Sequence, residues 1–71
     1  MVDLEAMGKI FEARRVALGK SITSVSHDTR LNVATIRRVE LGQNNPSVKM
    51  LETLAAALGL EITIEINKKG A

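Results

Sequence analysis

The sequence predicts a mainly α-helical domain in which four short helices are followed by one β-strand. Before each of four apolar-periodic stretches stands a side chain that can accept hydrogen bonds from the free amides of a helix N-terminus: Asp3, Ser21, Asn32 and Ser47. After three of these stretches stands a glycine, which favours the left-handed conformation at a helix C-terminus: Gly19, Gly42 and Gly59. Beyond the last glycine the apolar period changes to two, as in a half-buried strand.

The predicted helices have apolar residues on one face. They are expected at 4–18, 22–29, 33–41 and 48–58. In the third helix Ile36 and Val39 face inward, and Pro46 prevents helix across 43–45. The spacing i, i+3, i+4, i+7 of a core-facing stripe is complete in the last helix: Leu51, Leu54, Ala55 and Leu58.

The segment after the helices predicts self-association. Its apolar residues alternate with polar ones: Leu60, Ile62, Ile64 and Ile66. A lone strand is unstable by itself, and no second strand is visible in the chain. We therefore expect a helical domain at 1–59, a strand at 60–67 that pairs with its copy in a homodimer, and a flexible tail at 68–71.

Composition excludes several classes of site. The 71 residues allow one domain, and the absence of Cys excludes disulfides and thiolate metal sites. His27 is the one histidine, so no His-rich metal cluster is expected. We expect no cofactor, no membrane span and no signal peptide, and hence a cytoplasmic protein. The net charge is +2, but residues 30–49 hold four basic residues and one acid, a local charge of +3 that suggests nucleic acid.

An enzyme is not expected. Ser26, His27 and Asp28 are the residue types of a hydrolase triad, but consecutive helical residues point about 100° apart and cannot converge. No phosphate-binding glycine loop, carboxylate pair or metal-ligand spacing is present in the sequence.

The second and third helices are separated by only about three residues, which is typical of a helix-turn-helix unit. In that unit the second helix enters the DNA major groove. Here this helix begins with small residues, Val33-Ala34-Thr35, and carries Arg37 and Arg38 outward. Spacing alone fits equally a short amphipathic helix with a solvated basic side.

From Phe11 to Leu58 the chain resembles the XRE family, the helix-turn-helix proteins of the Cro and phage-repressor type. The matching residues keep the family's order and spacing: Phe11, Arg15, Gly19-Lys20-Ser21, Ile36, Glu40-Leu41-Gly42, Asn45-Pro46-Ser47, Leu51, Leu54 and Leu58-Gly59. The resemblance implies a λ-repressor-like fold of four to five helices that binds double-stranded DNA.

The resemblance also implies roles for individual residues. Four match positions that face bases: Asn32, Val33, Ala34 and Arg38. We expect a second set at the DNA backbone: Ser21, Arg30, Thr35, Arg37, Gln43, Asn44 and Asn45. Arg15 and Glu40 match a structural pair between the first and third helices.

Three residues depart from the family pattern. Ile22 replaces a glutamine that contacts phosphate, and Ser26 replaces an alanine of similar size. Arg30 stands where glycine is frequent. A left-handed arginine there costs on the order of 1 kcal/mol, unless the turn has another shape; in either case Arg30 can reach a phosphate.

The terminal strand, with Leu-Glu-Ile-Thr-Ile at 60–64, resembles that of HipB-type antitoxins, which implies a HipA-type toxin kinase as a candidate partner. The expected function is repression by a homodimer on a palindromic operator, with half-sites about 34 Å apart. Two alternatives stay open: an antitoxin that regulates its own operon, and a protein-interaction module without DNA binding. Ile22 and the apolar pair Val33-Ala34 favour the module, and the arginines oppose it.

Overall fold

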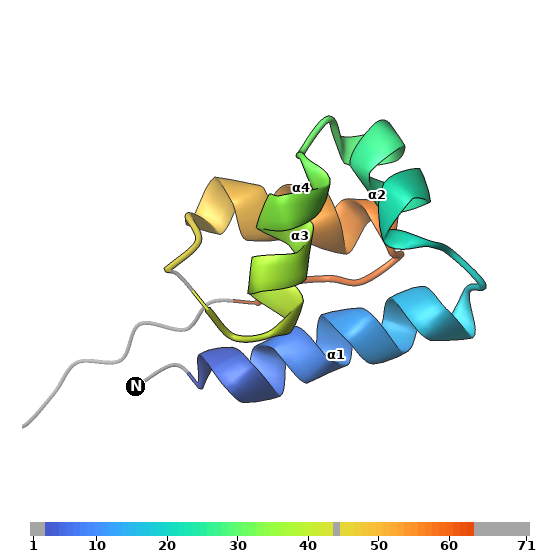
Figure 1. Cartoon of the computed structure of the whole chain (residues 1–71). Helices are drawn as coiled ribbons and strands as arrows, with labels where there is room; N and C mark the ends of the chain where they lie inside the picture. Colours follow the sequence, from blue (N-terminus) through green and yellow to red (C-terminus); the bar gives the residue numbers. More distant parts are fainter. Residues whose placement is uncertain (1–2, 44, 64–71) are drawn as a thin grey trace, which may run out of the picture.

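The computed structural model describes residues 3–43 and 45–63 (Figure 1). Four helices form within these residues: α1 (Leu4–Ala17), α2 (Ile22–Thr29), α3 (Val33–Glu40) and α4 (Val48–Ala57). The predicted mainly α-helical class is confirmed, and every helix begins at the predicted residue. Three of them end one residue early, because the last predicted residue is the C-cap: Leu18, Leu41 and Leu58.

The predicted caps form in the structure. Each N-cap side chain accepts a hydrogen bond from the amide three residues later, at 2.8–3.1 Å: Asp3, Ser21, Asn32 and Ser47. Three predicted helix stops have positive φ angles of 67–72°: Gly19, Gly42 and Gly59. Local side-chain chemistry therefore sets where these helices start and stop.

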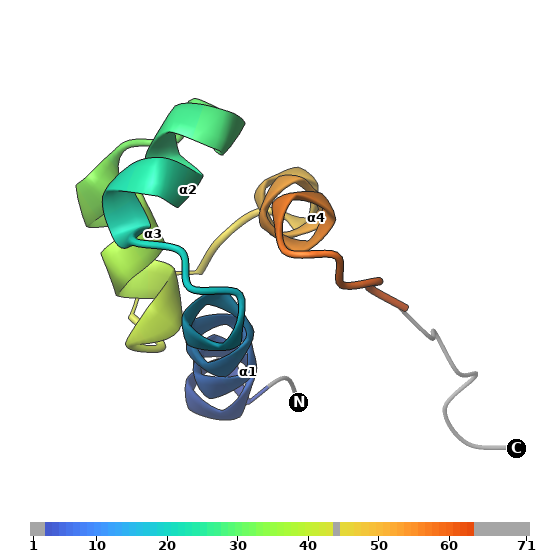
Figure 2. The ribbon, with the colours of Figure 1, turned by 90° about the vertical axis from the view of Figure 1, so that its right-hand side faces the viewer.

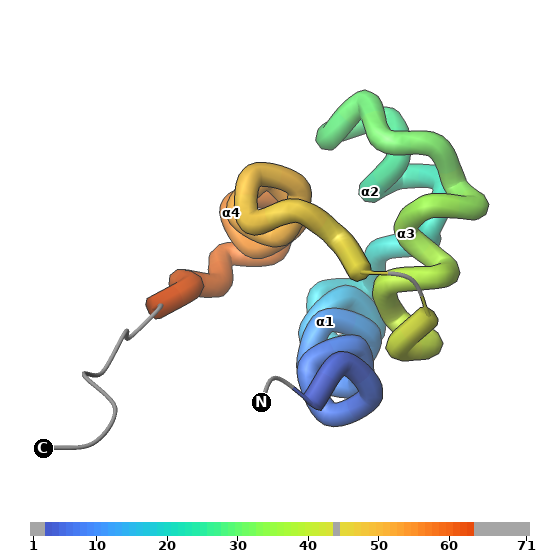
Figure 3. The backbone as a smooth tube through the Cα atoms, turned by 90° about the vertical axis from the view of Figure 1, so that its left-hand side faces the viewer, coloured from blue at the N-terminus to red at the C-terminus, as the bar shows by residue number. Residues whose placement is uncertain are grey.

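The helices enclose one small core. α1 packs on α3, and α2 packs on both α3 and α4. Seven apolar side chains are buried: Phe11, Val25, Ile36, Val39, Leu54, Ala55 and Leu58. α2 and α3 lie together on one side of the molecule, and the last described residues leave from α4 on the other side (Figure 2). The tube in Figure 3 shows the same separation from the opposite direction.

A glycine lets α1 and α3 approach closely. A Cβ atom at Gly8 would lie 2.5 Å from the carbonyl oxygens of both Val39 and Glu40. No pattern in the sequence predicted this contact. A glycine inside an amphipathic helix costs about 1 kcal/mol relative to alanine, and such a residue often marks close packing.

The C-terminal end of α4 is tied to the N-terminal half of the chain. Lys20 Nζ donates to the Ala57 carbonyl at 3.1 Å, and Arg14 Nε donates to the Leu58 carbonyl at 2.8 Å. Cations are favourable at this end of a helix because the last carbonyls carry partial negative charge. The segment that follows α4 therefore starts from a fixed point.

The described residues contain no strand and no fifth helix. Residues 60–63 follow α4 without pairing to another segment, and residues 64–67 of the predicted strand lie outside the described residues, as does the tail at 68–71. A strand needs a pairing partner, and residues 3–43 and 45–63 supply none. The terminal strand and its dimer therefore stay predictions. None of the four described helices has the length and apolarity to cross a bilayer.

Candidate nucleic-acid interface

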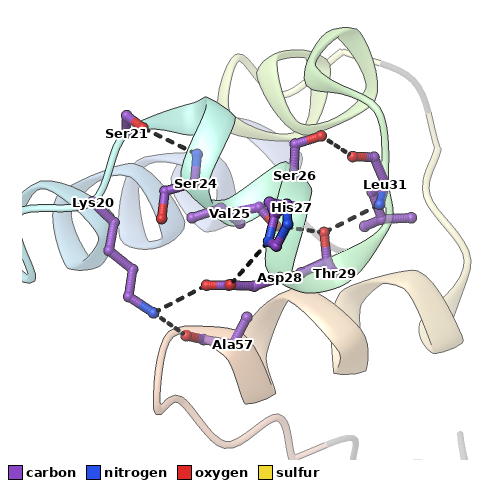
Figure 4. Close-up of polar contacts among 10 residues, drawn as sticks. All are labelled: Lys20, Ser21, Ser24, Val25, Ser26, His27, Asp28, Thr29, Leu31 and Ala57. Carbon is purple, nitrogen blue, oxygen red and sulfur yellow. Dashed lines mark hydrogen bonds and ion pairs between the residues drawn. The ribbon is translucent and has the colours of Figure 1, made fainter.

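The turn between α2 and α3 is held by two hydroxyl groups of α2 (Figure 4). Ser26 Oγ donates to the Leu31 carbonyl, and Thr29 Oγ1 accepts from the Leu31 amide at 3.2 Å. Thr29 also donates to the Val25 carbonyl at 2.7 Å. Neither bond was predicted from the sequence, where Ser26 was interpreted by its size alone and Thr29 was given no role. Their signal in the sequence is a pair of hydroxyl residues close before a tight turn, where side-chain bonds to the backbone are common.

The turn keeps the left-handed conformation at Arg30. This residue caps α2 with φ 63° and ψ 15°, and its amide donates to the Ser26 carbonyl at 2.8 Å. Within residues 3–43 and 45–63 no other non-glycine residue has a positive φ. Of the two possibilities for Arg30, the strained turn is therefore the one observed, at a cost of about 1 kcal/mol. The side chain is exposed.

α3 has a buried face and an outward face. Ile36, Val39 and Glu40 are buried in the domain. The outward face consists of exposed residues at spacings of three, four and seven: Ala34, Arg37, Arg38 and Leu41. Leu41, 55% exposed, was not predicted as a surface residue of this face. The helical period that placed Ile36 and Val39 inward also puts Leu41 outward, seven residues after Ala34.

Asn32 has a structural role at the start of α3. Its Oδ1 accepts from both the amide and the hydroxyl of Thr35, each at 2.8 Å. The side-chain NH2 group of Asn32 keeps its donors for a ligand, and the residue is exposed. Val33 and Thr35 are half-buried, so of the expected base-facing residues Ala34 and Arg38 are the ones that lie with Asn32 on the open surface.

Three of the expected backbone-contacting residues lie before α2 and after α3, at the two ends of the helix-turn-helix unit. Ser21 caps α2 by accepting from the Ser24 amide at 3.0 Å, which leaves its hydroxyl hydrogen free to donate (Figure 4). Gln43 and Asn45 are exposed in the loop between α3 and α4. Asn44 lies outside the described residues. Ile22, in place of the family's glutamine, packs against the core.

An ion pair fixes α3 on α1. Arg15 Nε lies 2.7 Å from Glu40 Oε2, and Arg15 Nη2 lies 3.1 Å from Oε1. Arg15 Nη1 also donates to the Lys20 carbonyl at 2.9 Å. The hydrogen bond to Glu40 raises the pKa of Arg15 above its ordinary value, although partial burial opposes the shift. Arg15 neutralises the buried Glu40 carboxylate, so this carboxylate does not repel an anion at the outward face.

The remaining charges leave the unit positive. In the described part of the chain no carboxylate lies within ion-pair distance of Arg30, Arg37 or Arg38. Lys20 differs, since its Nζ lies 3.6 Å from Asp28 Oδ2 (Figure 4). Three exposed guanidinium groups thus surround the turn and α3 without a competing anion from the described residues.

The hydrolase-like trio does not form a site. Ser26 donates to Leu31 rather than toward His27, whose ring is exposed and 3.9 Å from Asp28 (Figure 4). Among the residues that the structure describes, no three His, Cys, Asp or Glu side chains gather as metal ligands.

Two short helices, a tight turn between them and an outward second helix define a helix-turn-helix domain. The chain belongs to the helix-turn-helix family HTH_3, whose model matches residues 10–64. This confirms the family resemblance. The similarity to HipB-type antitoxins is not tested by this match.

The relatives are regulators. The chain is 24% identical over 66 residues to the transcriptional regulator ClgR of two Mycobacterium tuberculosis strains, CDC 1551/Oshkosh and H37Rv. The match covers 93% of this chain and 59% of those proteins, so the chain spans little more than half the length of these curated relatives.

Two solved structures are similar. The restriction-modification controller protein C.AhdI of Aeromonas hydrophila is 32% identical, with a TM-score of 0.78 over 83% of this chain and 89% of that one. The clp gene regulator ClgR of C. glutamicum has a TM-score of 0.81 over 87% of this chain and 80% of that one. At 21% identity the second similarity shows the fold alone.

Proposed function

We propose that this chain is a transcriptional regulator that binds double-stranded DNA sequence-specifically, as a homodimer on a palindromic operator that it occupies to repress transcription. The observation that carries the proposal is the outward face of α3, where Arg37 and Arg38 are exposed without a carboxylate partner among the described residues. The Arg15–Glu40 pair ties the helix to α1, so the position of the outward face is set by contacts within the domain.

Four residues at the start and on the outward face of α3 are assigned to contacts with bases. Arg38 is assigned to the O6 and N7 acceptors of guanine, a contact worth about 1–3 kcal/mol of discrimination. Ala34, one turn earlier on the same face, is assigned to a thymine methyl group, with Val33 beside it. Asn32 has its oxygen engaged with Thr35, so it acts as a donor to base acceptors through its NH2 group.

The contacts to phosphate position the domain without specifying sequence. Arg30 and Arg37 supply charge at the turn and on α3. Neutral donors complete the set: Ser21, Gln43, Asn44 and Asn45. Thr35 is assigned a place near the backbone, but its hydroxyl donates to Asn32 Oδ1 at 2.8 Å, so it would have to give up that bond to donate to a phosphate. This division supports a testable distinction, because base contacts alter specificity whereas phosphate contacts alter the salt dependence of all binding.

The experiment is selection of bound duplexes from a random DNA pool by the purified chain, with sedimentation of the same sample. The expected result is a palindromic consensus with half-sites about one helical turn apart, roughly 34 Å, bound by a dimer. A well-folded dimer that enriches no sequence above weak, salt-sensitive binding would contradict the proposal.

One observation favours a second function, a protein-interaction module. Leu41 is exposed on the outward face of α3, where an apolar side chain gains nothing from phosphate. This function predicts no enriched duplex and capture of a protein partner by the same face. A HipA-like toxin as that partner stays a prediction from the terminal segment alone.

A further inference from the structure

Leu41 is an exposed apolar side chain at the end of the outward face of α3. It is 55% exposed, and no other large apolar side chain between residues 32 and 43 is exposed. A small residue and two arginines share this face: Ala34, Arg37 and Arg38. A surface that docks a protein presents several apolar side chains together, whereas a single one among cations suits a single methyl group on an anionic ligand.

We infer that Leu41 is a specificity-determining residue that contacts the C5-methyl group of a thymine in the DNA major groove. The inference rests on the proposed function and deepens it, because it adds a second methyl contact to the one assigned to Ala34 and gives its place in the operator. Thymine presents a methyl group in this groove, and apolar side chains recognise it.

The backbone around Leu41 is held on both sides. Its φ of -84° and ψ of -3° continue the helix, and its amide donates to the Arg37 carbonyl at 3.0 Å. A Cβ atom at Gly42 would lie 2.7 Å from the Cα of Glu5, so the chain after Leu41 lies directly on α1 (Figure 1). Contacts within the domain therefore set the position of Leu41 on the outward face.

The helical neighbours of Leu41 indicate what it can reach. Leu41 follows Arg37, assigned to phosphate, by four residues and Arg38, assigned to guanine, by three. Residues at these spacings are neighbours on a helix surface. Leu41 therefore adjoins both the residue assigned to the DNA backbone and the residue assigned to a base edge. The C5 position of a pyrimidine lies between the same two parts of DNA, at the outer edge of the groove beside its own sugar and phosphate.

The helical rise predicts which base pair carries the methyl group. Leu41 is about 4.5 Å from Arg38 along the helix axis, at a rise of about 1.5 Å per residue. Successive base pairs are about 3.4 Å apart along the duplex axis. For a helix that lies along the groove, the thymine is therefore expected within about two base pairs of the guanine of Arg38.

The test removes the methyl group from DNA and the apolar side chain from the protein, separately and together. In the operator obtained by duplex selection, each thymine is replaced in turn by deoxyuridine, which lacks only the C5-methyl group. The DNA is unmethylated, so thymine is the source of any C5-methyl effect. Competition binding measures the Kd of each duplex, and the guanine of Arg38 is the one whose preference Arg38→Ala relaxes.

At the thymine near this guanine, the unchanged chain is expected to lose about fourfold in affinity per half-site, which corresponds to the burial of one methyl group. Leu41→Ala is expected to bind the thymine and deoxyuridine duplexes with equal affinity at this position. Its response at the other thymines should match that of the unchanged chain, which shows that the variant is folded and binds in the same register.

Leu18→Ala is the matched control. Leu18 is the C-cap of α1 with φ -83° and ψ -1°, and a glycine of positive φ follows it, as one follows Leu41. It is 41% exposed and lies at the end of a different helix. Loss of an apolar side chain at a helix end is thus common to both variants, but Leu18→Ala should keep the full response to deoxyuridine.

The outcomes separate the methyl contact from DNA binding itself. A Leu41→Ala variant that still loses affinity for deoxyuridine near the guanine of Arg38 would overturn the contact, as would a consensus without thymine at these base pairs, while the selected operator would still support DNA binding. A chain that enriches no duplex would overturn the proposed function and this inference with it, and would leave Leu41 to the protein-interaction module.

Discussion

Two short connections in this molecule differ in the hydrogen bonds that the chain supplies to their backbone. The turn at residues 30–32 is bonded at each end by α2, through the hydroxyls of Ser26 and Thr29 and the amide of Arg30. The segment at 60–63 has one backbone bond, at Leu60, within the described residues. The first connection holds a surface that is complete in one chain. The second leads into the segment that the sequence predicts to pair with a second copy.

The hydrogen bonds at the turn matter for the proposed DNA binding. A recognition face has to be preorganised, because ordering it on binding would weaken affinity. In the proposed homodimer the segment at 60–63 would complete its backbone bonds only on association, which agrees with the single bond that it has within the described residues. Substitutions in α1, α3 and the turn between α2 and α3 test the part of the molecule that is bonded within one chain.

The largest effect is expected from breaking the ion pair that holds α3. Arg15→Ala leaves the Glu40 side chain, which is 4% exposed, without its partner. Removing one partner of a buried pair costs about 3–5 kcal/mol, and the partial exposure of Arg15 places the loss near the lower value. Urea unfolding measures it, with Lys9→Ala, an exposed change on the same helix, as the control.

A double substitution sharpens this result. Arg15→Leu with Glu40→Leu removes both charges, and apolar replacements of a buried pair are often neutral or stabilising. We therefore expect the double variant to be more stable than Arg15→Ala. Equal stability of the two would mean that the pair does not hold α3 through its charges.

Gly8→Ala gives the next largest effect, and its sign is diagnostic. Helix propensity alone predicts a gain of about 1 kcal/mol. The new Cβ would lie 2.5 Å from the backbone carbonyls of Val39 and Glu40, so we expect instead a loss of about 1–3 kcal/mol from overpacking. Urea unfolding decides between the two signs. Ala13→Gly on the exposed face of α1 is the control and should lose about 1 kcal/mol through propensity.

Gly8 also illustrates what sequence reasoning can and cannot predict. The helix starts followed from caps such as Ser21 and Asn32, which act on amides three residues away. The close approach at Gly8 joins residues that are more than 30 positions apart, so no local pattern contains it. The same reason hid the bonds from Arg14 and Lys20 to the end of α4.

The candidate interface likewise has features that the sequence predicted and features that only the structure shows. The outward position of Arg37 and Arg38 followed from helical period. The two roles of Asn32, as cap and as donor, required knowing where Thr35 lies. The terminal strand that the alternation at 60–67 predicts stays a prediction, because the described part of this segment, residues 60–63, is not strand and the rest lies outside the described residues.

Substitution on α3 tests whether the preorganised face reads bases. Arg38→Ala is expected to relax the preference at one base pair per half-site by about 1–3 kcal/mol. Arg37→Ala is its matched control, an exposed arginine on the same helix assigned to phosphate. It should weaken all sequences alike and reduce the salt slope by about 1. Competition binding with duplexes altered at single positions measures both, and a uniform loss from Arg38→Ala would remove that residue from the bases.

The smallest effect on stability is expected at the turn, and it separates the strain of Arg30 from its charge. Arg30→Ala and Arg30→Gly both remove the guanidinium group, so each should reduce the salt slope of DNA binding by about 1. Only glycine adopts φ 63° without a Cβ penalty of about 1 kcal/mol, and its greater freedom in the unfolded chain offsets part of that gain.

Arg30→Gly should therefore be more stable than Arg30→Ala by no more than about 1 kcal/mol in urea unfolding, with equal DNA affinity. An alanine variant as stable as the glycine variant would show that the bonds from Ser26 and Thr29, rather than the residue at position 30, determine the shape of the turn. In that case the same bonds would account for how an arginine is tolerated in the left-handed conformation at position 30.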